Sequence, residues 1–152
     1  MTVQTSKSST ENLVRYSLFI ERLRKFLTQR GVIEVATPVV TCSASLEPTI
    51  ESVRLGERFY LRTSPESALK QLVALHEMDV FEIGPVFRGR ESGSLHLEQF
   101  SLLEYYRLGF DCDAMMSELS CLLEVLGWRK PITKTSYQTL FEKVLDHVLG
   151  AL

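Results

Sequence analysis

The sequence predicts an α+β fold in which an antiparallel sheet is flanked by helices. Three observations favour it: helical apolar spacing near both ends, two strand-like segments around a polar loop in residues 80–108, and no regular alternation of strand and helix. A parallel sheet would require that alternation. With 152 residues, the chain is also long enough to bury the core of one domain.

The first helix is predicted from Leu13 to the glycine at position 31, which is a typical C-terminal stop. Residues 1–10 are polar and rich in Ser and Thr, so we expect a flexible N-terminus followed by one domain over residues 11–152. The apolar residues of the helix are spaced alternately by three and four, which places them on one face. They are Leu13, Tyr16, Ile20, Leu23 and Leu27.

Two strands and a helix are predicted next. Val32–Val40 is rich in β-branched residues, and Pro38 should end this strand or lie on an edge or interface because proline cannot donate to a ladder. Phe59–Arg62 is a short strand that leads into a turn. A helix is then predicted over Pro65–His76, because Ser64 offers a capping hydroxyl before a proline and an acid.

The remaining elements are a hairpin and two helices. Val80–Phe87 and Phe100–Leu108 are predicted to pair as antiparallel strands across the polar loop. A helix closed by Gly127 follows, and a last helix begins after Ser136. The apolar stripe of the first of these helices is Met115, Leu119, Leu122 and Leu126.

Composition excludes several classes of protein. The 17 basic and 19 acidic residues give a net charge of -2, so no general basic field attracts nucleic acid. The cysteines at 42, 112 and 121 are odd in number and lack CxxC spacing, which favours reduced thiols acting as small apolar residues. Without a signal-peptide pattern or an apolar run of 18 residues, the expected location is cytoplasmic.

The strand after the polar loop carries an acid among apolar residues. Phe100, Leu102, Glu104, Tyr106 and Leu108 share one face by the period of two. A carboxylate buried there needs a cation, because an unpaired buried charge is costly. A ligand ammonium is one candidate partner, and an arginine of the protein, such as Arg62 or Arg88, is the other.

Three collinear segments of the chain resemble the motifs of one enzyme family. They are Arg30–Pro38, Leu61–Glu66, and a third set made of Phe87, Arg88, His96, Phe100 and Leu103–Tyr106. The resemblance is to class II aminoacyl-tRNA synthetase catalytic domains, and within them to the lysyl-tRNA-synthetase-like ligases that attach a lysine derivative to elongation factor P. The first segment matches motif 1, the second the amino-acid-binding turn, and the third motif 2 with its following strand.

The resemblance implies an activity and a set of site residues. Such enzymes use ATP and Mg²⁺ to join an amino-acid carboxylate to the α-phosphate, here with lysine or a lysine isomer. Arg88 would be the catalytic residue, because a planar guanidinium can bridge the carboxylate and the phosphate. Phe100 would stack on adenine. The residues matched to amino-acid binding are Ser64, Glu66, Glu104 and Tyr106.

The loop between the two strands departs from the family pattern. Gly89-Arg90 stands where the family has Asn-Glu, and Leu97-Glu98-Gln99 stands where it has Asn-Pro-Glu. Arg90 therefore replaces an acid that helps to hold ATP, and it could add positive charge near the triphosphate. Glu91 could substitute for the missing acid, and His96 could reach the β- or γ-phosphate.

The third motif of the family, a glycine-rich segment with a second arginine, has no counterpart, since Gly150 is the only glycine after Gly127. We therefore expect the chain to hold about the first half of a catalytic domain. It also lacks the family's anticodon-binding barrel, so tRNA is not an expected partner. Two functions stay open: an ATP-dependent ligase, with elongation factor P as acceptor and a homodimer formed through Pro38, or an inactive dimerising or amino-acid-binding module.

Overall fold

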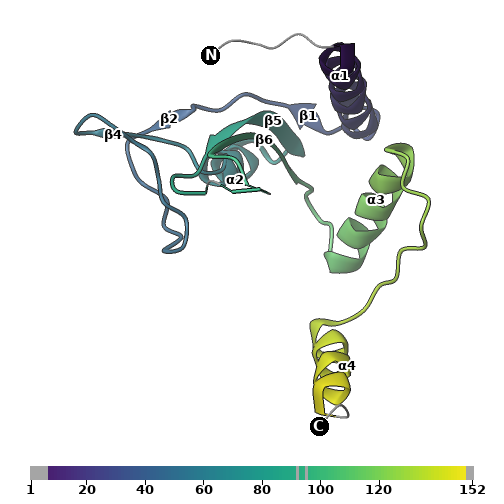
Figure 1. The fold of residues 1–152 in the computed structure, drawn as a ribbon. Coiled ribbons are helices and arrows are strands. Elements are labelled where there is room, and N and C mark those ends of the chain that lie inside the picture. Colours follow the sequence, from purple (N-terminus) through teal and green to yellow (C-terminus); the bar gives the residue numbers. More distant parts are fainter. Residues whose placement is uncertain (1–6, 92, 95, 150–152) are drawn as a thin grey trace. The chain divides into compact units, whose positions relative to one another are not determined.

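The computed structural model describes residues 7–149 except 92 and 95, and the chain divides into two compact units, Met1–Phe110 and Asp111–Leu152. The first unit contains two helices and six strands, and the second contains two helices (Figure 1). This content confirms the predicted α+β class. No helix in the described ranges is long and apolar enough to cross a membrane.

Helix α1 spans Lys7–Thr28, so it begins earlier than the apolar pattern indicated. Its end is as predicted, because Gly31 adopts a φ of 78° that favours glycine. Only the C-terminal half of the predicted stripe is core: Leu23 and Leu27 are buried, whereas the side chain of Leu13 is 63% exposed. The N-terminal half of α1 therefore presents apolar side chains to the surface.

The predicted strand Val32–Val40 is divided into two short strands that belong to different sheets. β1 spans Ile33–Glu34 and β2 spans Val40–Thr41. Between them, the backbone N–H of Thr37 donates to the Glu82 carboxylate over 3.2 Å instead of to a strand. The prediction of one continuous strand was wrong for two reasons. The Thr37 N–H is bound to the Glu82 carboxylate instead of to a backbone carbonyl of a neighbouring strand, and Pro38 has no N–H to donate.

The first sheet has the order β1-β5-β6. β5 (Val80–Phe87) and β6 (Gln99–Tyr106) form the predicted antiparallel pair, in register from Val80 opposite Tyr106 to Phe87 opposite Gln99. β1 pairs with β5 in parallel, however, so the sheet is mixed and the antiparallel prediction was only partly right. The chain between β1 and β5 passes through the second sheet and a helix, which returns it in the same direction.

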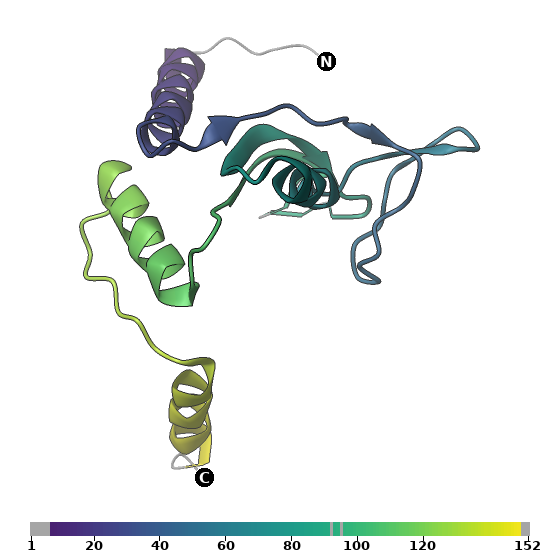
Figure 2. The same ribbon diagram turned by 180° about the vertical axis from the view of Figure 1, so that it is seen from behind.

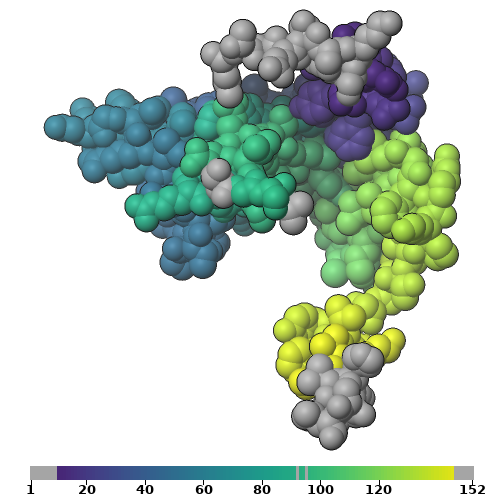
Figure 3. All heavy atoms as spheres, in the orientation of Figure 1, coloured from purple at the N-terminus to yellow at the C-terminus, as the bar shows by residue number. Residues whose placement is uncertain are grey.

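The second sheet is antiparallel, with the order β2-β4-β3. β4 (Phe59–Leu61) matches the predicted short strand. β3 (Arg54–Leu55) was not predicted, and it joins β4 through a hairpin in which Gly56 has a φ of 61°. In Figure 3 this blue segment projects from one side of the first unit.

Helix α2 spans Glu66–His76, one residue shorter at its start than predicted, and packs across β5 and β6, as two opposite views show (Figures 1 and 2). Its cap position is Pro65, whereas Ser64 contributes a hydroxyl that accepts from the Glu66 N–H at 3.0 Å. Leu69 is fully buried on its inner face. The core of this unit is built from Val32, Leu69, Val80, Phe81 and Val86.

The second unit confirms both predicted C-terminal helices. α3 spans Cys112–Val125, with Gly127 at a φ of 99° after its end, and α4 spans Tyr137–Leu149 with the Ser136 hydroxyl accepting from the Thr139 N–H. All three cysteines of the chain are free and exposed. The prediction of unpaired thiols is therefore confirmed, but the interpretation of these cysteines as small apolar residues was wrong in that none of the three is buried.

Candidate active site

The predicted amino-acid-binding turn and Arg88 are brought together by the backbone of Arg62. The Arg62 N–H donates to the Val39 carbonyl at 2.9 Å, and the Arg62 carbonyl accepts from the Phe87 N–H at 2.9 Å. The turn after β4 is thereby fastened to the end of β5. Residues 63–66 and 88, far apart in sequence, become neighbours at one edge of the first unit.

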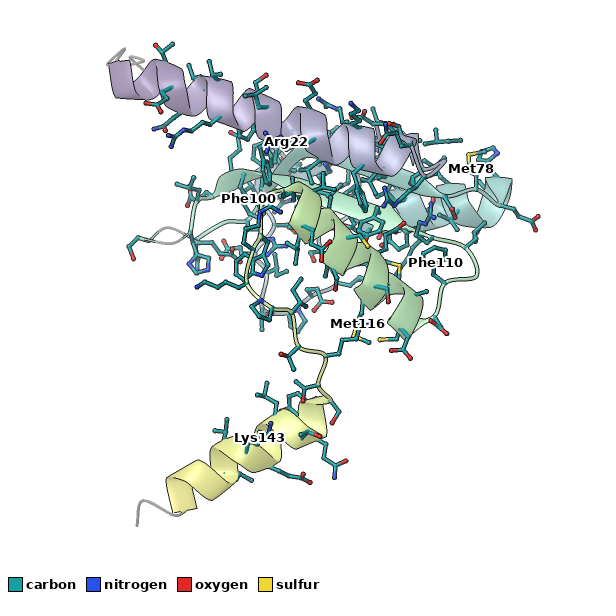
Figure 4. The ribbon with its side chains drawn as sticks, turned by 90° about the vertical axis from the view of Figure 1, so that its right-hand side faces the viewer. Arg22, Met78, Phe100, Phe110, Met116 and Lys143 are labelled. Atoms are coloured by element: carbon teal, nitrogen blue, oxygen red, sulfur yellow. The ribbon has the colours of Figure 1, made fainter. Side chains whose placement is uncertain are left out.

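Arg88 lies between this turn and Phe100. Its Nε donates to the Thr63 carbonyl at 3.4 Å, and its guanidinium carbon is 5.2 Å from the centroid of the Phe100 ring. Phe100, labelled in Figure 4, is one residue into β6 and is half-buried. A guanidinium over an aromatic face is held favourably while its outer N–H groups stay available.

Glu104 is bound by two hydroxyl groups. The Ser64 hydroxyl donates to one carboxylate oxygen and the Tyr106 hydroxyl to the other, each at 2.6 Å. Glu104 and Tyr106 therefore share a face of β6, as the period of two predicted. Ion pairs among the described residues include none to Glu104, so the predicted alternative that Arg62 or Arg88 neutralises it was wrong.

A second carboxylate lies directly opposite Glu104 in the sheet. Glu82 of β5 is its register partner, and residues directly opposite each other point to the same face. Glu82 is paired with Arg62, whose Nη2 is 2.6 Å from Oε1. The two carboxylates on this face therefore have different partners: Glu82 forms an ion pair with Arg62, whereas Glu104 accepts hydrogen bonds from two hydroxyl groups.

Glu66, in the first turn of α2, forms an ion pair with Lys70 one turn further on. Both side chains are more than half exposed, so the pair contributes little to stability. The hydrogen bond and the charge of Glu66 raise the pKa of Lys70, to which Glu104 adds. Sequence reasoning missed Lys70, although its spacing of four from Glu66 was a visible signal.

Burial raises the pKa of Tyr106 well above its ordinary value of 10.0, and the hydrogen bond to Glu104 raises it further. Above pH 10 the folded protein therefore binds more protons than the unfolded chain, and the free energy of unfolding should fall as pH rises past about 10. We expect ultraviolet absorbance to show that Tyr106 resists ionisation above pH 10. Replacement of Tyr106 by Phe should remove that late step and weaken the alkaline loss of stability, whereas Tyr137→Phe should not. Ionisation of all tyrosines together near pH 10 would contradict the assignment.

The polar loop forms an open cavity of about 420 Å³ beside Arg88. Its other lining residues are three of those predicted to bind ATP, namely Arg90, Glu91 and His96, whereas Phe100 does not line it. Two guanidinium groups and an imidazole face this space against one carboxylate, which favours an anionic ligand. Residues 92 and 95 of the loop lie outside the described residues.

Arg90 forms an ion pair with Glu51 of the same chain. It has a φ of 60°, and its Nε is 2.9 Å from a carboxylate oxygen of Glu51, while the Gly89 N–H donates to the Glu51 carbonyl at 2.8 Å. Glu51 was missed by sequence reasoning, because no local pattern links it to the loop. Glu51 places a carboxylate beside the loop, in which Arg90 stands where the family has an acid.

The predicted interface residue Pro38 is not part of this site. Pro38 is exposed on the segment between β1 and β2, and its interface role stays a prediction. Within the described ranges, no three His, Cys, Asp or Glu side chains are grouped to hold a metal ion.

The chain matches the family of class II tRNA synthetases (D, K and N) over residues 1–143, so it belongs to this family. Among curated proteins it is similar to elongation factor P--(R)-beta-lysine ligases. It is 33% identical over 148 residues to the one from Pasteurella multocida and 34% identical over 149 residues to the one from Pseudoalteromonas translucida. The matches cover 90% and 91% of this chain but 45% of each relative, so the chain spans about half the length of these proteins.

Proposed function

We propose that this chain forms the amino-acid- and ATP-binding part of an enzyme that activates lysine or a lysine isomer as an adenylate. The observation that carries the proposal is the position of Arg88 between the turn at 63–66 and Phe100. A carboxylate bound at the turn and a nucleotide stacked on Phe100 would meet at this guanidinium. The ligase names of the relatives support lysine as the amino acid and elongation factor P as the acceptor.

In the proposed reaction, a carboxylate oxygen of the amino acid attacks the α-phosphorus of ATP. An oxygen–phosphorus bond forms, the bond from the α-phosphorus to the bridging oxygen breaks, and pyrophosphate leaves with the electron pair. Arg88 would orient the carboxylate and balance the charge that develops on the phosphoryl oxygens. No proton transfer from the protein is required in this step.

The amino acid would be held through its ammonium groups. Glu66 is exposed at the turn and would exchange its Lys70 partner for the α-ammonium, with the Ser64 hydroxyl beside it. Glu104, whose charge has no cation partner among the described ion pairs, would bind a second ammonium with the Tyr106 oxygen. A substrate with two ammonium groups fits two carboxylates better than a neutral amino acid does.

The nucleotide would occupy the cavity beside Arg88. Phe100 would stack on adenine, an interaction worth roughly 1–3 kcal/mol per base. His96 and Arg90 would face the phosphates, and Glu91 would take the place of the loop acid. Because Mg²⁺ is usually held by one or two carboxylates together with substrate phosphates, Glu91 would hold it only when ATP is bound, and the described residues form no separate metal site.

A homodimer would cover the apolar surface of the first unit. Exposed apolar residues occur on α1 between positions 13 and 19 and on β1, of which Ile33 in β1 is close in sequence to Pro38. A second copy is the occupant that the family resemblance supports. The exposed residues are Leu13, Val14, Tyr16, Leu18, Phe19 and Ile33.

The proposal is tested by lysine-dependent exchange of labelled pyrophosphate into ATP, with β-lysine compared. Exchange above the level without amino acid would demonstrate adenylate formation. A folded protein that binds lysine without exchange would instead support the second function, an amino-acid-binding module. Absence of both exchange and lysine binding would overturn the proposed function.

Replacement of Glu66 by Gln should weaken lysine binding about 10- to 100-fold, because a charge-assisted hydrogen bond is lost. ATP affinity should be nearly unchanged, since Glu66 lies at the turn and not in the loop cavity. Calorimetric titration with each ligand measures both values. Glu57→Gln, in the exposed hairpin between β3 and β4, is the matched control. Equal losses for lysine and ATP would indicate a structural role.

A further inference from the structure

A buried polar network lies beneath the amino-acid-binding turn. Arg62 and Glu82 have side chains only 2% and 6% exposed, and their ion pair measures 2.6 Å. Thr37, also buried, is bound to both. None of these three residues contacts the loop cavity, and the proposed reaction uses none of them.

Arg62 Nη1 and Nε, the Thr37 hydroxyl and Glu82 Oε2 each have a directed hydrogen-bond partner, whereas Arg62 Nη2 makes only the ion pair with Glu82 Oε1. The Thr37 hydroxyl donates to Glu82 Oε2 at 2.7 Å and accepts from Arg62 Nη1 at 2.8 Å. Arg62 also donates from Nη1 to the Thr37 carbonyl at 3.2 Å and from Nε to the Pro85 carbonyl at 3.0 Å. The guanidinium is therefore fixed by contacts to two different segments of the chain.

The backbone of the first sheet makes room for this arrangement. A Cβ atom at Gly84 would lie 2.5 Å from Arg62 Nη2 and 2.9 Å from Glu82 Oε1. A glycine in the middle of a strand weakens the strand, so its presence here is explained by the close approach of the ion pair. The buried ion pair therefore requires glycine at position 84, because any side chain there would collide with it.

The same arginine holds the site through its backbone. Its N–H and carbonyl bind Val39 and Phe87, and the next residue, Thr63, receives the hydrogen bond from Arg88. A rotation of Arg62 would thus move the turn that carries Glu66 and the carbonyl that orients Arg88. The side-chain network fixes Arg62, and the position of Arg62 in turn sets the positions of the turn and of Arg88.

We propose that Thr37 and Glu82, acting through Arg62, are positioning residues that fix the turn at residues 63–66 for amino-acid binding. Without the Thr37 hydroxyl, Arg62 and Glu82 each lose one of the bonds that set their orientation. The consequence for amino-acid binding rests on the proposed function. The ordering of the turn by the network is independent of the proposed function, and it can be measured without any ligand.

The test replaces Thr37 by Val, which removes the hydroxyl and keeps the shape, and by Ser, which keeps the hydroxyl. In Thr37→Val, amide hydrogen exchange measured by NMR should be about tenfold faster at Arg62, Glu66 and Phe87. Exchange at Ile33, which is bound to Asp79 in the same sheet, should stay unchanged. Thr37→Ser should restore the slow exchange.

Two controls separate positioning from general loss of stability. Thr41→Val removes hydroxyl bonds to the Ser43 carbonyl at 2.8 Å and to the Tyr60 carbonyl at 3.4 Å, both outside the network, and should leave all these amides unaffected. Equal acceleration at Ile33 and at the turn in Thr37→Val would mean global destabilisation and would overturn the proposal. So would unchanged exchange at the turn.

The functional arm is calorimetric binding of lysine and of ATP to the same variants. Lysine affinity should fall about tenfold in Thr37→Val and recover in Thr37→Ser, with a smaller loss of ATP affinity because only the Arg88 hydrogen bond to the Thr63 carbonyl links the turn to the nucleotide cavity. If the unaltered protein does not bind lysine, the proposed function fails, while the exchange pattern still decides whether the network orders the turn. Normal lysine affinity in Thr37→Val with a loosened turn would overturn the link to amino-acid binding.

Discussion

Replacement of Arg88 by Ala is expected to lower the rate of lysine-dependent pyrophosphate exchange by about 10²–10³, the effect of removing one donor that stabilises charge in a transition state. The reason is its place between Thr63 and Phe100, where its guanidinium would meet both the carboxylate and the α-phosphate. Arg88→Lys keeps the charge but not the planar fork and should recover only part of the rate.

Arg54→Ala is the matched control for this experiment. Arg54 is exposed on β3 and donates to the Glu57 carbonyl within its own hairpin, so its loss should leave exchange unchanged. Circular dichroism should show the same helix content in all three variants. Full exchange in a folded Arg88→Ala protein would remove Arg88 from the proposed reaction.

Replacement of Arg62 by Met should give the largest loss of stability, about 3–5 kcal/mol in the free energy of unfolding. The substitution leaves the Glu82 carboxylate buried without its cation, and the remaining donors from Thr37 do not neutralise it. Denaturant unfolding followed by circular dichroism measures the loss. Arg54→Met, on the exposed hairpin, should change the value little.

A double substitution distinguishes the buried charge from a loss of packing. In Arg62→Met with Glu82→Leu, the pair is replaced by apolar side chains, which is often neutral or stabilising, so much of the lost free energy should return. A loss below about 1 kcal/mol in Arg62→Met alone would mean that Glu82 is not held as a buried carboxylate. No recovery in the double variant would locate the effect in packing around Gly84.

Local sequence signals predicted the elements that depend on near neighbours. The helices at Glu66–His76 and Tyr137–Leu149 and the hairpin of β5 and β6 follow from apolar spacing, caps and glycines. The shared face of Glu104 and Tyr106 follows from the period of two in a strand. The resemblance to class II synthetases, confirmed at the level of the family, also came from short segments.

Other features depend on partners that are distant in sequence. The split of Val32–Val40, the parallel pairing of β1 with β5, and the new strand β3 each result from contacts that no local pattern contains. Arg90 likewise meets Glu51 only because the segment before β3 lies against the loop.

By itself, the sequence determined which residue types stand at the turn, at the strand end and on the β6 face, because these follow from spacing along the chain. Only the tertiary structure decided which partners the two carboxylates have. Arg62 forms an ion pair with Glu82, whereas Glu104 accepts hydrogen bonds from the hydroxyl groups of Ser64 and Tyr106. Two carboxylates in adjacent strands offered the same arginine alternative partners, and the choice depends on where the turn after β4 places its guanidinium. That placement depends on hydrogen bonds to Val39 and Phe87, which spacing along the chain does not specify.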